Sequence, residues 1–311
     1  RIEAADGRLA VSVDDASAVY PIRIDPTFSD ANWVVMNPTI SGVDGWVMAI
    51  TPDTLGNLYV GGSSISLAGG SRANNIAKWN GSEWSALGSG LEGEFCQVNA
   101  LAVDNSGNLF AGGWFSTAGG VAANNIAKWN GSEWSTLGAG VGVYENWESV
   151  NALAVDSSGN LFAGGGFSTA GGVAANNIAK WNGSTWTTLG SGTDSSVLAL
   201  GLSSNGLLYA GGQFTTAGGV SANRIAKWNG SAWSALGSGL NDYVNTLKVN
   251  SSDVLYVGGD FTTAGGVTVN RIAKWNGSAW SALGSGMNHE VKSIAFDGVG
   301  NLYAAGQFTT A

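Results

Sequence analysis

Acidic and aromatic side chains recur in the segments that lead into each copy of a Val-x-x-Leu/Ile element. Carboxylates beside aromatic rings are suited to bind a cationic partner, a carbohydrate or a hard cation such as Ca²⁺. The ligand-binding candidates of this kind are Glu92, Glu94, Phe95, Tyr144, Glu145, Trp147, Glu148 and His289, together with Trp114 and Asp260, which each follow a Gly-Gly pair. Weaker candidates, for Ca²⁺ alone, are Asp44, Asp194, Asp242 and Glu290.

The segments before Val98 and Val150 are the longest that combine aromatic with acidic residues. If this part of the molecule binds a ligand, we expect these two segments to dominate, with Trp114 as the floor between them. Connecting loops on a rigid scaffold are where binding residues are normally found. The alternative interpretation is that the acids only solvate the loops of a weakly charged protein.

Catalysis is limited by the supply of residues. The single histidine, His289, and the single cysteine, Cys96, exclude a disulfide framework and a zinc site built from Cys and His. A Ser-His-Asp arrangement could use only His289, and no nucleophile-elbow motif is near it. A hydrolase with paired carboxylates stays open as an alternative, although nothing in the spacing selects two of them. We expect a protein that is not an enzyme and has no cofactor other than Ca²⁺.

Charge and hydropathy exclude further classes of function. The chain has 311 residues, with 13 Lys and Arg against 22 Asp and Glu, and this net charge of −9 opposes binding to nucleic-acid phosphates. The longest apolar runs are shorter than the ~18 residues that cross a bilayer, so no membrane insertion is expected. The chain begins at Arg1, and we expect that a signal peptide was removed or that the chain belongs to a longer protein.

These candidate residues lie between copies of an internal repeat. The phrase Ile-Ala-Lys-Trp-Asn-Gly occurs five times, and a Gly-Gly-containing phrase and a Trp-x-x-Leu/Met element each occur six times. In the fourth copy the four β-type runs are Val197–Leu202, Leu208–Gly212, Arg224–Trp228 and Ala232–Leu236. Each run is short, apolar and bounded by turn residues, which is typical of a strand. Repeats of four antiparallel strands at this period predict a β-propeller.

Two of these runs resemble the kelch repeat of galactose-oxidase-type propellers. They read LYAGG over Leu208–Gly212 and RIAKWNGSAWSAL over Arg224–Leu236, and the likeness covers about residues 31–311. The chain has Trp-Asn where the kelch pattern has Tyr-Asp. The resemblance implies a propeller but no activity, because a kelch-like copper oxidase needs two histidines and His289 is alone.

The number of blades is predicted to be six, with five or seven as alternatives. The sixth blade would take two strands from each end of the chain, with Tyr20–Asp25 as its third strand and Trp33 in its fourth. Alternatively, Tyr20–Asp25 ends a preceding domain. We expect residues 1–19 to form a β-hairpin or a linker, in which Arg8–Val13 and Ala18–Ile24 can pair, and residues 20–311 to form the propeller.

Three repeated features are predicted to be structural. The lysines before each Trp-Asn, such as Lys128, should lay their stems over apolar surface, with aspartates such as Asp104 as partners. The Asn-Gly-Ser triplets, such as the one at Asn130, match both a hairpin turn and an N-glycosylation signal, and the turn explains them without a sugar. The paired tryptophans should pack between blades.

The function class that fits these features is a binding or interaction scaffold that is secreted or at the cell surface, in a bacterium. It would recognise a protein or a glycan through the loops on one face of the propeller. The alternative is a structural subunit of an extracellular fibre or surface layer, with open strand edges that allow self-assembly. The carboxylate hydrolase comes third.

Overall fold

The computed structural model describes residues 2–5, 8–11, 42–143 and 147–311. The chain divides into two units, Arg1–Trp33 and Val34–Ala311. In the first unit β1 (Ile2–Ala5) and β2 (Arg8–Val11) pair antiparallel. The strand predicted from Arg8 is present, but among the described residues its partner is β1. The partner predicted for it, Ala18–Ile24, and the predicted boundary after residue 19 lie outside the described residues.

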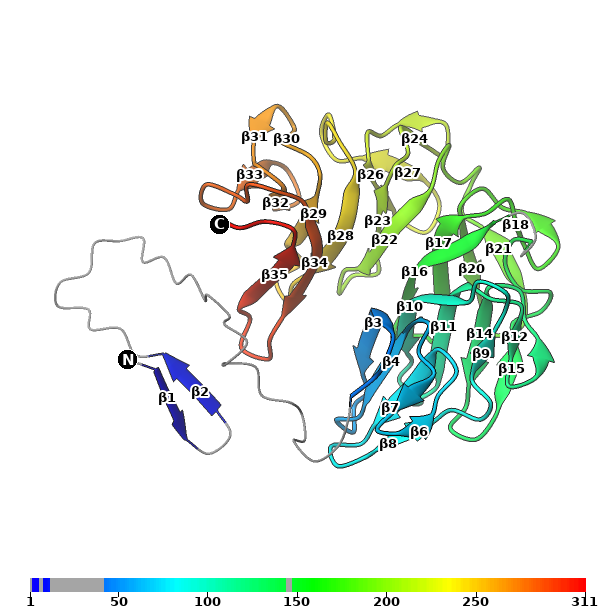
Figure 1. The fold of residues 1–311 in the computed structure, drawn as a ribbon. Helices are drawn as coiled ribbons and strands as arrows, with labels where there is room; N and C mark the ends of the chain where they lie inside the picture. The colour runs from blue at the N-terminus through cyan, green and yellow to red at the C-terminus, as the bar shows by residue number, and fades with distance from the viewer. Residues whose placement is uncertain (1, 6–7, 12–41, 144–146) are drawn as a thin grey trace. The chain divides into compact units, whose positions relative to one another are not determined.

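The described part of the second unit is a series of antiparallel β-sheets, which confirms the all-β propeller of four-stranded blades (Figure 1). The first strands of the successive blades are β3 (Trp46–Pro52), β10 (Gln97–Val103), β16 (Ser149–Val155), β22 (Val197–Leu202), β28 (Val244–Val249) and β34 (Val291–Phe296). The second strands are β4 (Leu58–Ser63), β11 (Leu109–Trp114), β17 (Leu161–Gly166), β23 (Leu208–Gly212), β29 (Leu255–Gly259) and β35 (Leu302–Gly306). The third strands are β7 (Ile76–Trp79), β14 (Ile126–Trp129), β20 (Ile178–Trp181), β26 (Ile225–Trp228) and β32 (Ile272–Trp275). The fourth strands are β8 (Trp84–Ala86), β15 (Trp134–Thr136), β21 (Trp186–Thr188), β27 (Trp233–Ala235) and β33 (Trp280–Ala282).

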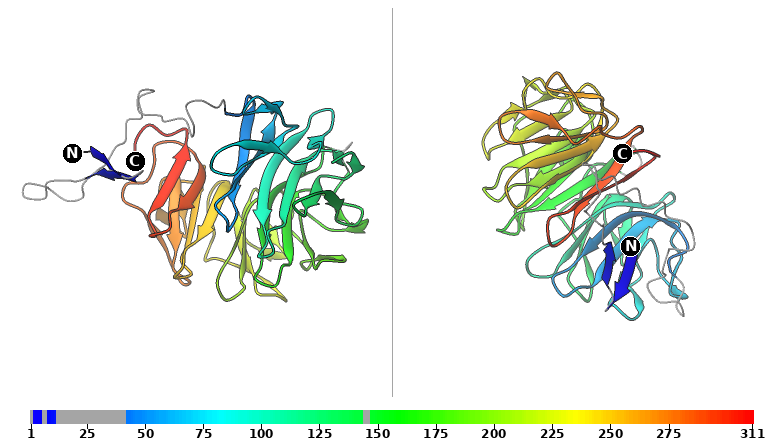
Figure 2. Two further views of the ribbon diagram at one scale, coloured as in Figure 1. Left: turned by 90° about the horizontal axis from the view of Figure 1, so that it is seen from below. Right: turned by 90° about the vertical axis from the view of Figure 1, so that its left-hand side faces the viewer.

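The described residues thus contain five complete blades, numbered 1 to 5 in chain order, and a sixth unit of two strands, β34 and β35 (Figure 2). Tyr20–Asp25 and Trp33, the segments predicted to complete the sixth blade, lie outside the described residues. Within the described ranges no helix is long and apolar enough to cross a membrane.

A short hairpin stands between the second and third strands of each complete blade. These hairpins are β5 (Leu67–Ala68) with β6 (Ser71–Arg72), β12 (Thr117–Ala118) with β13 (Val121–Ala122), β18 (Thr169–Ala170) with β19 (Val173–Ala174), β24 (Thr216–Ala217) with β25 (Val220–Ser221), and β30 (Thr263–Ala264) with β31 (Val267–Thr268). In blade 2 the segment that leads into the blade forms β9 (Leu91–Glu92), which pairs with β12. Isolated bridges such as Val141 to Ala170 do the same in other blades. The entry loops therefore lie beside the hairpin loops, as predicted.

Neighbouring blades approach most closely where the valine that begins the Val-x-x-Leu/Ile element meets a glycine. Val98 is fully buried, and a Cβ atom placed on Gly61 of the preceding blade would lie 2.6 Å from its Cγ1 atom. The same contact, at 2.5–2.6 Å, recurs at every joint, in the pairs Gly61–Val98, Gly112–Val150, Gly164–Val197, Gly211–Val244 and Gly258–Val291. Only a residue without a side chain allows this spacing.

Tryptophans join the outer parts of neighbouring blades. The Nε1–H of Trp134 in blade 2 donates a hydrogen bond of 2.8 Å to the carbonyl oxygen of Leu87 in blade 1. The equivalent bonds run from Trp186 to Leu137, from Trp233 to Leu189 and from Trp280 to Leu236. Each of these tryptophans also packs against the tryptophan that ends the third strand, as Trp134 does with Trp129 at 5.5 Å. The predicted packing between blades is confirmed.

The repeated lysines and asparagines serve the blades. The ammonium group of Lys128 lies 5.7 Å from the centroid of the Phe110 ring, a cation–π contact that Lys78 and Lys180 also make in their own blades. Lys128 does not form the predicted ion pair with Asp104 among the contacts of the described residues. The Oδ1 atom of Asn130 accepts hydrogen bonds from the backbone N–H groups of Ser132 and Glu133, which is the turn role predicted for Asn-Gly-Ser.

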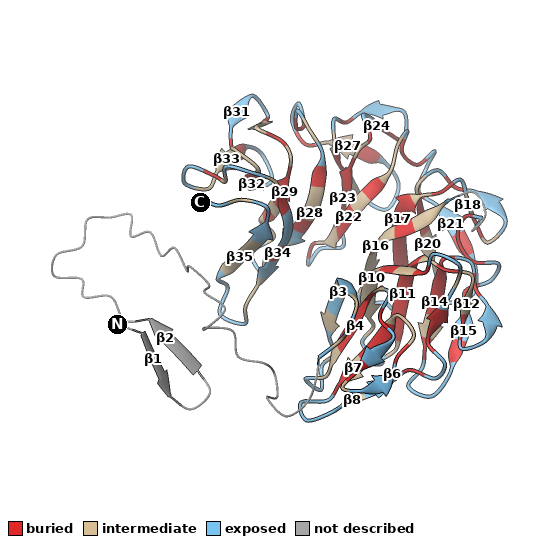
Figure 3. Ribbon diagram, viewed as in Figure 1, coloured by how far each residue is buried: buried red, intermediate tan, exposed pale blue. Residues whose placement is uncertain are grey.

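Burial falls off at both ends of the series (Figure 3). Strands such as β11 and β17 are buried almost throughout, whereas β34 and β35 are largely exposed or intermediate. In β3 the side chain of Trp46 is 77% exposed and that of Ile50 is 57% exposed. Val47 is 42% exposed although its counterparts at the joints are fully buried. The outward faces of the first and last units thus present apolar side chains.

The glycine of each joint can be tested by a double-mutant cycle. We expect Gly211→Ala to destabilise the protein by about 1–3 kcal/mol, because the added methyl group overlaps Cγ1 of Val244. In the Val244→Ala background that atom is gone, so the same change should cost much less. Chemical unfolding of the four proteins measures the coupling, and equal costs in both backgrounds would contradict the proposed contact.

Candidate functional site

Three of the predicted ligand-binding residues come together between blades 2 and 3. Phe95 lies in the loop that enters blade 2, and Trp114 ends β11, where it pairs with Gln97 at the start of β10. Trp147 lies in the next entry loop, just before β16. We call Phe95, Trp114 and Trp147 the aromatic cluster.

The three rings of the aromatic cluster are in mutual contact, with two pairs stacked and one pair tilted. Phe95 and Trp114 have ring centroids 5.5 Å apart and planes at 15°, while Phe95 and Trp147 are 5.9 Å apart at 24°. The centroids of Trp114 and Trp147 are 4.5 Å apart, with planes at 37°. Trp147 is 70% exposed and Phe95 is 52% exposed, and Trp114 is half-buried. The cluster is therefore a continuous apolar surface that faces solvent.

The backbone of Trp147 is held in an unfavourable conformation. Its φ is +62°, in the left-handed region that bulky side chains rarely adopt. The next residue, Glu148, accepts hydrogen bonds from the backbone N–H of Val143, at 2.6 Å, and of Ser168, at 2.8 Å. These bonds close the loop and attach it to the hairpin loop of blade 3. Such strain persists where the surroundings enforce it, and it is concentrated at functional sites.

Glu148 performs a task that polar side chains perform in other blades. Oδ1 of Asp194 accepts hydrogen bonds from the backbone N–H groups of Thr215, at 2.8 Å, and Thr216, at 2.9 Å. Burial raises the pKa of Asp194, but these bonds and one from the Thr215 hydroxyl outweigh it and hold that pKa below its ordinary value. Asp44 clamps its hairpin loop in the same way, and Asn241 and Asn288 do so with amide oxygens.

A pocket of about 300 Å³ adjoins the aromatic cluster, because Phe95 lines both. Its lining residues are Ser63, Ser64, Asn75, Gly93, Glu94, Phe95, Cys96 and Gln97. We call it the Ser63 pocket. The Cys96 thiol is buried, and this burial raises its pKa to about 12, so it is not a thiolate nucleophile at neutral pH.

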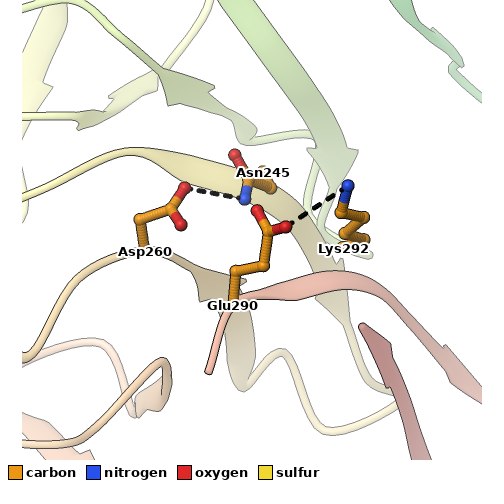
Figure 4. A network of polar contacts seen from close by, with 4 residues as sticks. All are labelled: Asn245, Asp260, Glu290 and Lys292. Carbon is orange, nitrogen blue, oxygen red and sulfur yellow. Dashed lines mark hydrogen bonds and ion pairs between the residues drawn. The ribbon is translucent and has the colours of Figure 1, made fainter. Parts of the chain in front are cut away.

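Other candidates lie apart from the aromatic cluster. Figure 4 shows Asn245, Asp260, Glu290 and Lys292 pointing toward one another. The Nδ2–H of Asn245 donates to Oδ2 of Asp260 at 3.0 Å, and Lys292 lies 3.3 Å from the Glu290 carboxylate. His289 is exposed in the loop beside Glu290. Asp260 and Glu290 thus each have a polar partner within this group.

The remaining predicted residues do not add to the cluster. Oε1 of Glu92 accepts a hydrogen bond from Asn74, and Asp242 accepts one from its neighbour, the backbone N–H of Tyr243. Tyr144 and Glu145 lie outside the described residues. Among the residues that the structure describes, no three His, Cys, Asp or Glu side chains are grouped so that they could hold a metal ion. The Ca²⁺ candidates Asp44, Asp194, Asp242 and Glu290 accordingly stand in separate loops.

Sequence reasoning missed the Ser63 pocket. The signal was the residue after the Gly-Gly pair, which is Ser63 in blade 1 and Trp114 in blade 2. A small side chain next to a large one on the neighbouring blade leaves room for a pocket. The positions of acidic and aromatic residues alone do not reveal this pocket. The clamping role of Glu148 and Asp194 was also missed, because it depends on hydrogen bonds to a loop about 20 residues away.

No protein-family model matches the chain, and no curated protein matches it. Solved structures resemble it in fold. The WD40 repeats of RRP9 have a TM-score of 0.55 at 14% identity, over 83% of this chain and 72% of that one. The WD40 β-propeller domain of Doa1 has a TM-score of 0.53 at 14% identity, over 84% and 75%. A catalytically inactive virginiamycin B lyase from Staphylococcus aureus, with quinupristin, has 0.52 at 12%, over 83% and 76%.

The chain is thus similar to propellers that include an enzyme as well as WD40 repeat domains. At such low identity the likeness shows the fold alone. The resemblance to the kelch repeat stays a prediction.

The clamp role of Asp194 can be tested by pH. Asp194→Asn should keep both backbone hydrogen bonds, as Asn241 does, but it loses the charge and the Oδ2 acceptor of the Thr215 hydroxyl, so the wild type should be more stable at pH 7. Asp194→Ala should lose all of these bonds and cost about 1 kcal/mol at pH 7. Because the folded pKa of Asp194 is lowered, its contribution to stability is present above pH 3.8 and decreases as the pH falls through the folded pKa. Melting temperatures between pH 7 and pH 3 should therefore show the wild-type advantage over Asp194→Asn shrinking, and a constant difference would contradict this role.

Proposed function

We propose that the chain is a binding module whose ligand, a protein or a glycan, docks on the aromatic cluster of Phe95, Trp114 and Trp147. The observation that carries this proposal is the exposed cluster of three aromatic rings in mutual contact, with Trp147 held at a positive φ. Isolated exposed apolar residues are common on soluble proteins, but a contiguous patch typically marks an interaction site. Tryptophan anchors of this kind contribute most of the binding energy in many interfaces.

The proposal places the module outside the cell, secreted or at the cell surface of a bacterium. It is supported by the low content of charged residues, 11%, the acidic balance and the kelch-like repeat. A role as a hydrolase is not proposed, because Asp44, Glu148 and Asp194 hold loops in place and Glu290 is paired with Lys292.

A second candidate is a structural subunit that assembles with other copies. It is favoured by the exposed apolar side chains of β3, such as Ile50, and of β35, such as Tyr303, which is 58% exposed. Light scattering over a concentration series separates the two candidates, since an assembling subunit grows in mass and Ile50→Asp should prevent this growth.

The proposed binding surface predicts distinct effects for three variants. Trp147→Gly removes the exposed ring and relaxes the backbone, so we expect at least a tenfold loss of affinity with little change in melting temperature. Trp114→Ala should also lose binding. Tyr243→Ala, at the exposed aromatic residue that enters blade 5, is the matched control and should bind normally.

The measurements are binding of labelled protein to an array of immobilised glycans and to an array of extracellular protein domains, together with thermal melts. Unchanged binding by both tryptophan variants would refute the proposed surface. If Trp114→Ala lowered only the melting temperature, Trp114 would be a packing residue.

A further inference from the structure

We infer that the ligand of this face is a neutral carbohydrate, bound at one site per chain. One sugar ring would stack on the aromatic cluster and the hydroxyl groups of the saccharide would enter the Ser63 pocket. This inference rests on the proposed function and names its ligand class. It follows from three features of the site: the angle between the rings, the state of the nearby acids and the chemistry of the pocket.

The ring geometry favours a flat ligand over a cation. An aromatic cage for a quaternary ammonium group surrounds a gap, with the cation within about 6 Å of each ring centroid. In the aromatic cluster the centroids are only 4.5–5.9 Å from one another and the planes meet at 15–37°, so no group fits between the rings. The exposed surface of the cluster lies on Trp147 and Phe95, which are 70% and 52% exposed. A pyranose ring can pack against this surface with its apolar face of C–H groups.

The nearby acids are mostly engaged, which also disfavours a cationic ligand. Both carboxylate oxygens of Glu148 accept backbone hydrogen bonds, and Oε1 of Glu92 accepts one from Asn74. The acid that lines the Ser63 pocket is Glu94, which is exposed. A single exposed carboxylate beside a polar pocket suits a sugar, because it can accept a hydrogen bond from one of the sugar hydroxyl groups.

The Ser63 pocket has the groups and the size for sugar hydroxyls. The hydroxyls of Ser63 and Ser64 and the amide of Gln97 both donate and accept hydrogen bonds, as sugar hydroxyls do. The amide of Asn75 also lines the pocket, but its Nδ2–H donates to the Leu91 carbonyl oxygen at 3.0 Å. Its volume of about 300 Å³ is at the lower end of the range for ligand pockets, and this fits a single ring better than a peptide segment.

The site occurs once because neighbouring blades differ at the same position. The residue after the Gly-Gly pair is Ser63 in blade 1, Trp114 in blade 2 and Gly166 in blade 3. The small Ser63 of blade 1 thus leaves room for the pocket, and Phe95 in the loop that enters blade 2 lines it. The joint between blades 3 and 4 has Gly166 beside Ser196 and no aromatic cluster. A stoichiometry of one saccharide per chain follows.

The experiment uses the whole chain and an array of neutral and charged glycans, with trimethyl-lysine peptides as a competing class. We expect neutral saccharides to bind, and isothermal titration with the best oligosaccharide to give one site. Affinity should change less than twofold between 20 and 500 mM NaCl, because no ion pair is formed. Ser63→Trp, which places the blade 2 residue in the pocket, and Gln97→Ala should each weaken binding at least tenfold.

The matched control is Gln213→Ala, at the position in blade 4 that corresponds to Ser63, and it should bind as the wild type does. Thermal melts check that each variant is folded, and Gln97→Ala, which adds no bulk, remains informative if Ser63→Trp does not fold. Binding of trimethyl-lysine peptides alone, several equal sites per chain or strong salt dependence would overturn the carbohydrate inference. If a protein ligand bound and Trp147→Gly abolished that binding, this inference would fail while the proposed function stood.

Discussion

The close contact between a valine and a glycine at each joint is the constraint on which the rest of the structure depends. The first strand of each blade can pack against the second strand of the preceding blade only because the first residue of each Gly-Gly pair has no Cβ atom. The second glycine is required within the blade, since a Cβ atom on Gly113 would lie 1.9 Å from the Gln97 carbonyl oxygen at the bulge of β10. The tryptophan-to-leucine hydrogen bonds join the same neighbouring blades at their outer strands.

The joints are alike, and the differences that shape this face lie in the loops and in the residue that follows the Gly-Gly pair. A side-chain clamp such as Asp194 or Asn241 ties the entry loop to the hairpin loop in blades 1, 3, 4 and 5. In blade 2 the backbone carbonyl oxygen of Glu92 accepts the equivalent hydrogen bond from Ser116. Glu148 serves as this clamp in a longer loop, and it carries Trp147 beside it. The proposed binding surface thus stands on a loop that is held in the same way as the loops of other blades. This explains how an exposed tryptophan can be held at a positive φ without disturbing the blade.

The blades could be predicted from the sequence because their strands are set by local patterns: short apolar runs, Asn-Gly turns and a repeat. The shared face of Phe95, Trp114 and Trp147 was also predictable, since entry loops and second strands end at the same side of a blade. The sequence could not show which carboxylates are free and which are engaged in hydrogen bonds within the protein. Whether Asp194 is free or engaged depends on the fold of a hairpin about 20 residues away. The Ser63 pocket likewise arises from side-chain volumes on two different blades.

The sixth unit departs from the repeat at the position of the joint glycine. The register Ser293 to Ala305 in β34 and β35 corresponds to Ala199 to Gly211 in blade 4, so Ala305 stands where every other blade has its joint glycine. Its methyl group occupies the space that a valine of a following blade would need. Val47, by contrast, is exposed and keeps the side chain that the joint uses. By the geometry of the repeat, a strand pair that covers Val47 must have glycine at the position where β35 has Ala305. Copies that assemble head to tail through β3 and β35 would therefore need a contact other than the valine–glycine contact of the joints.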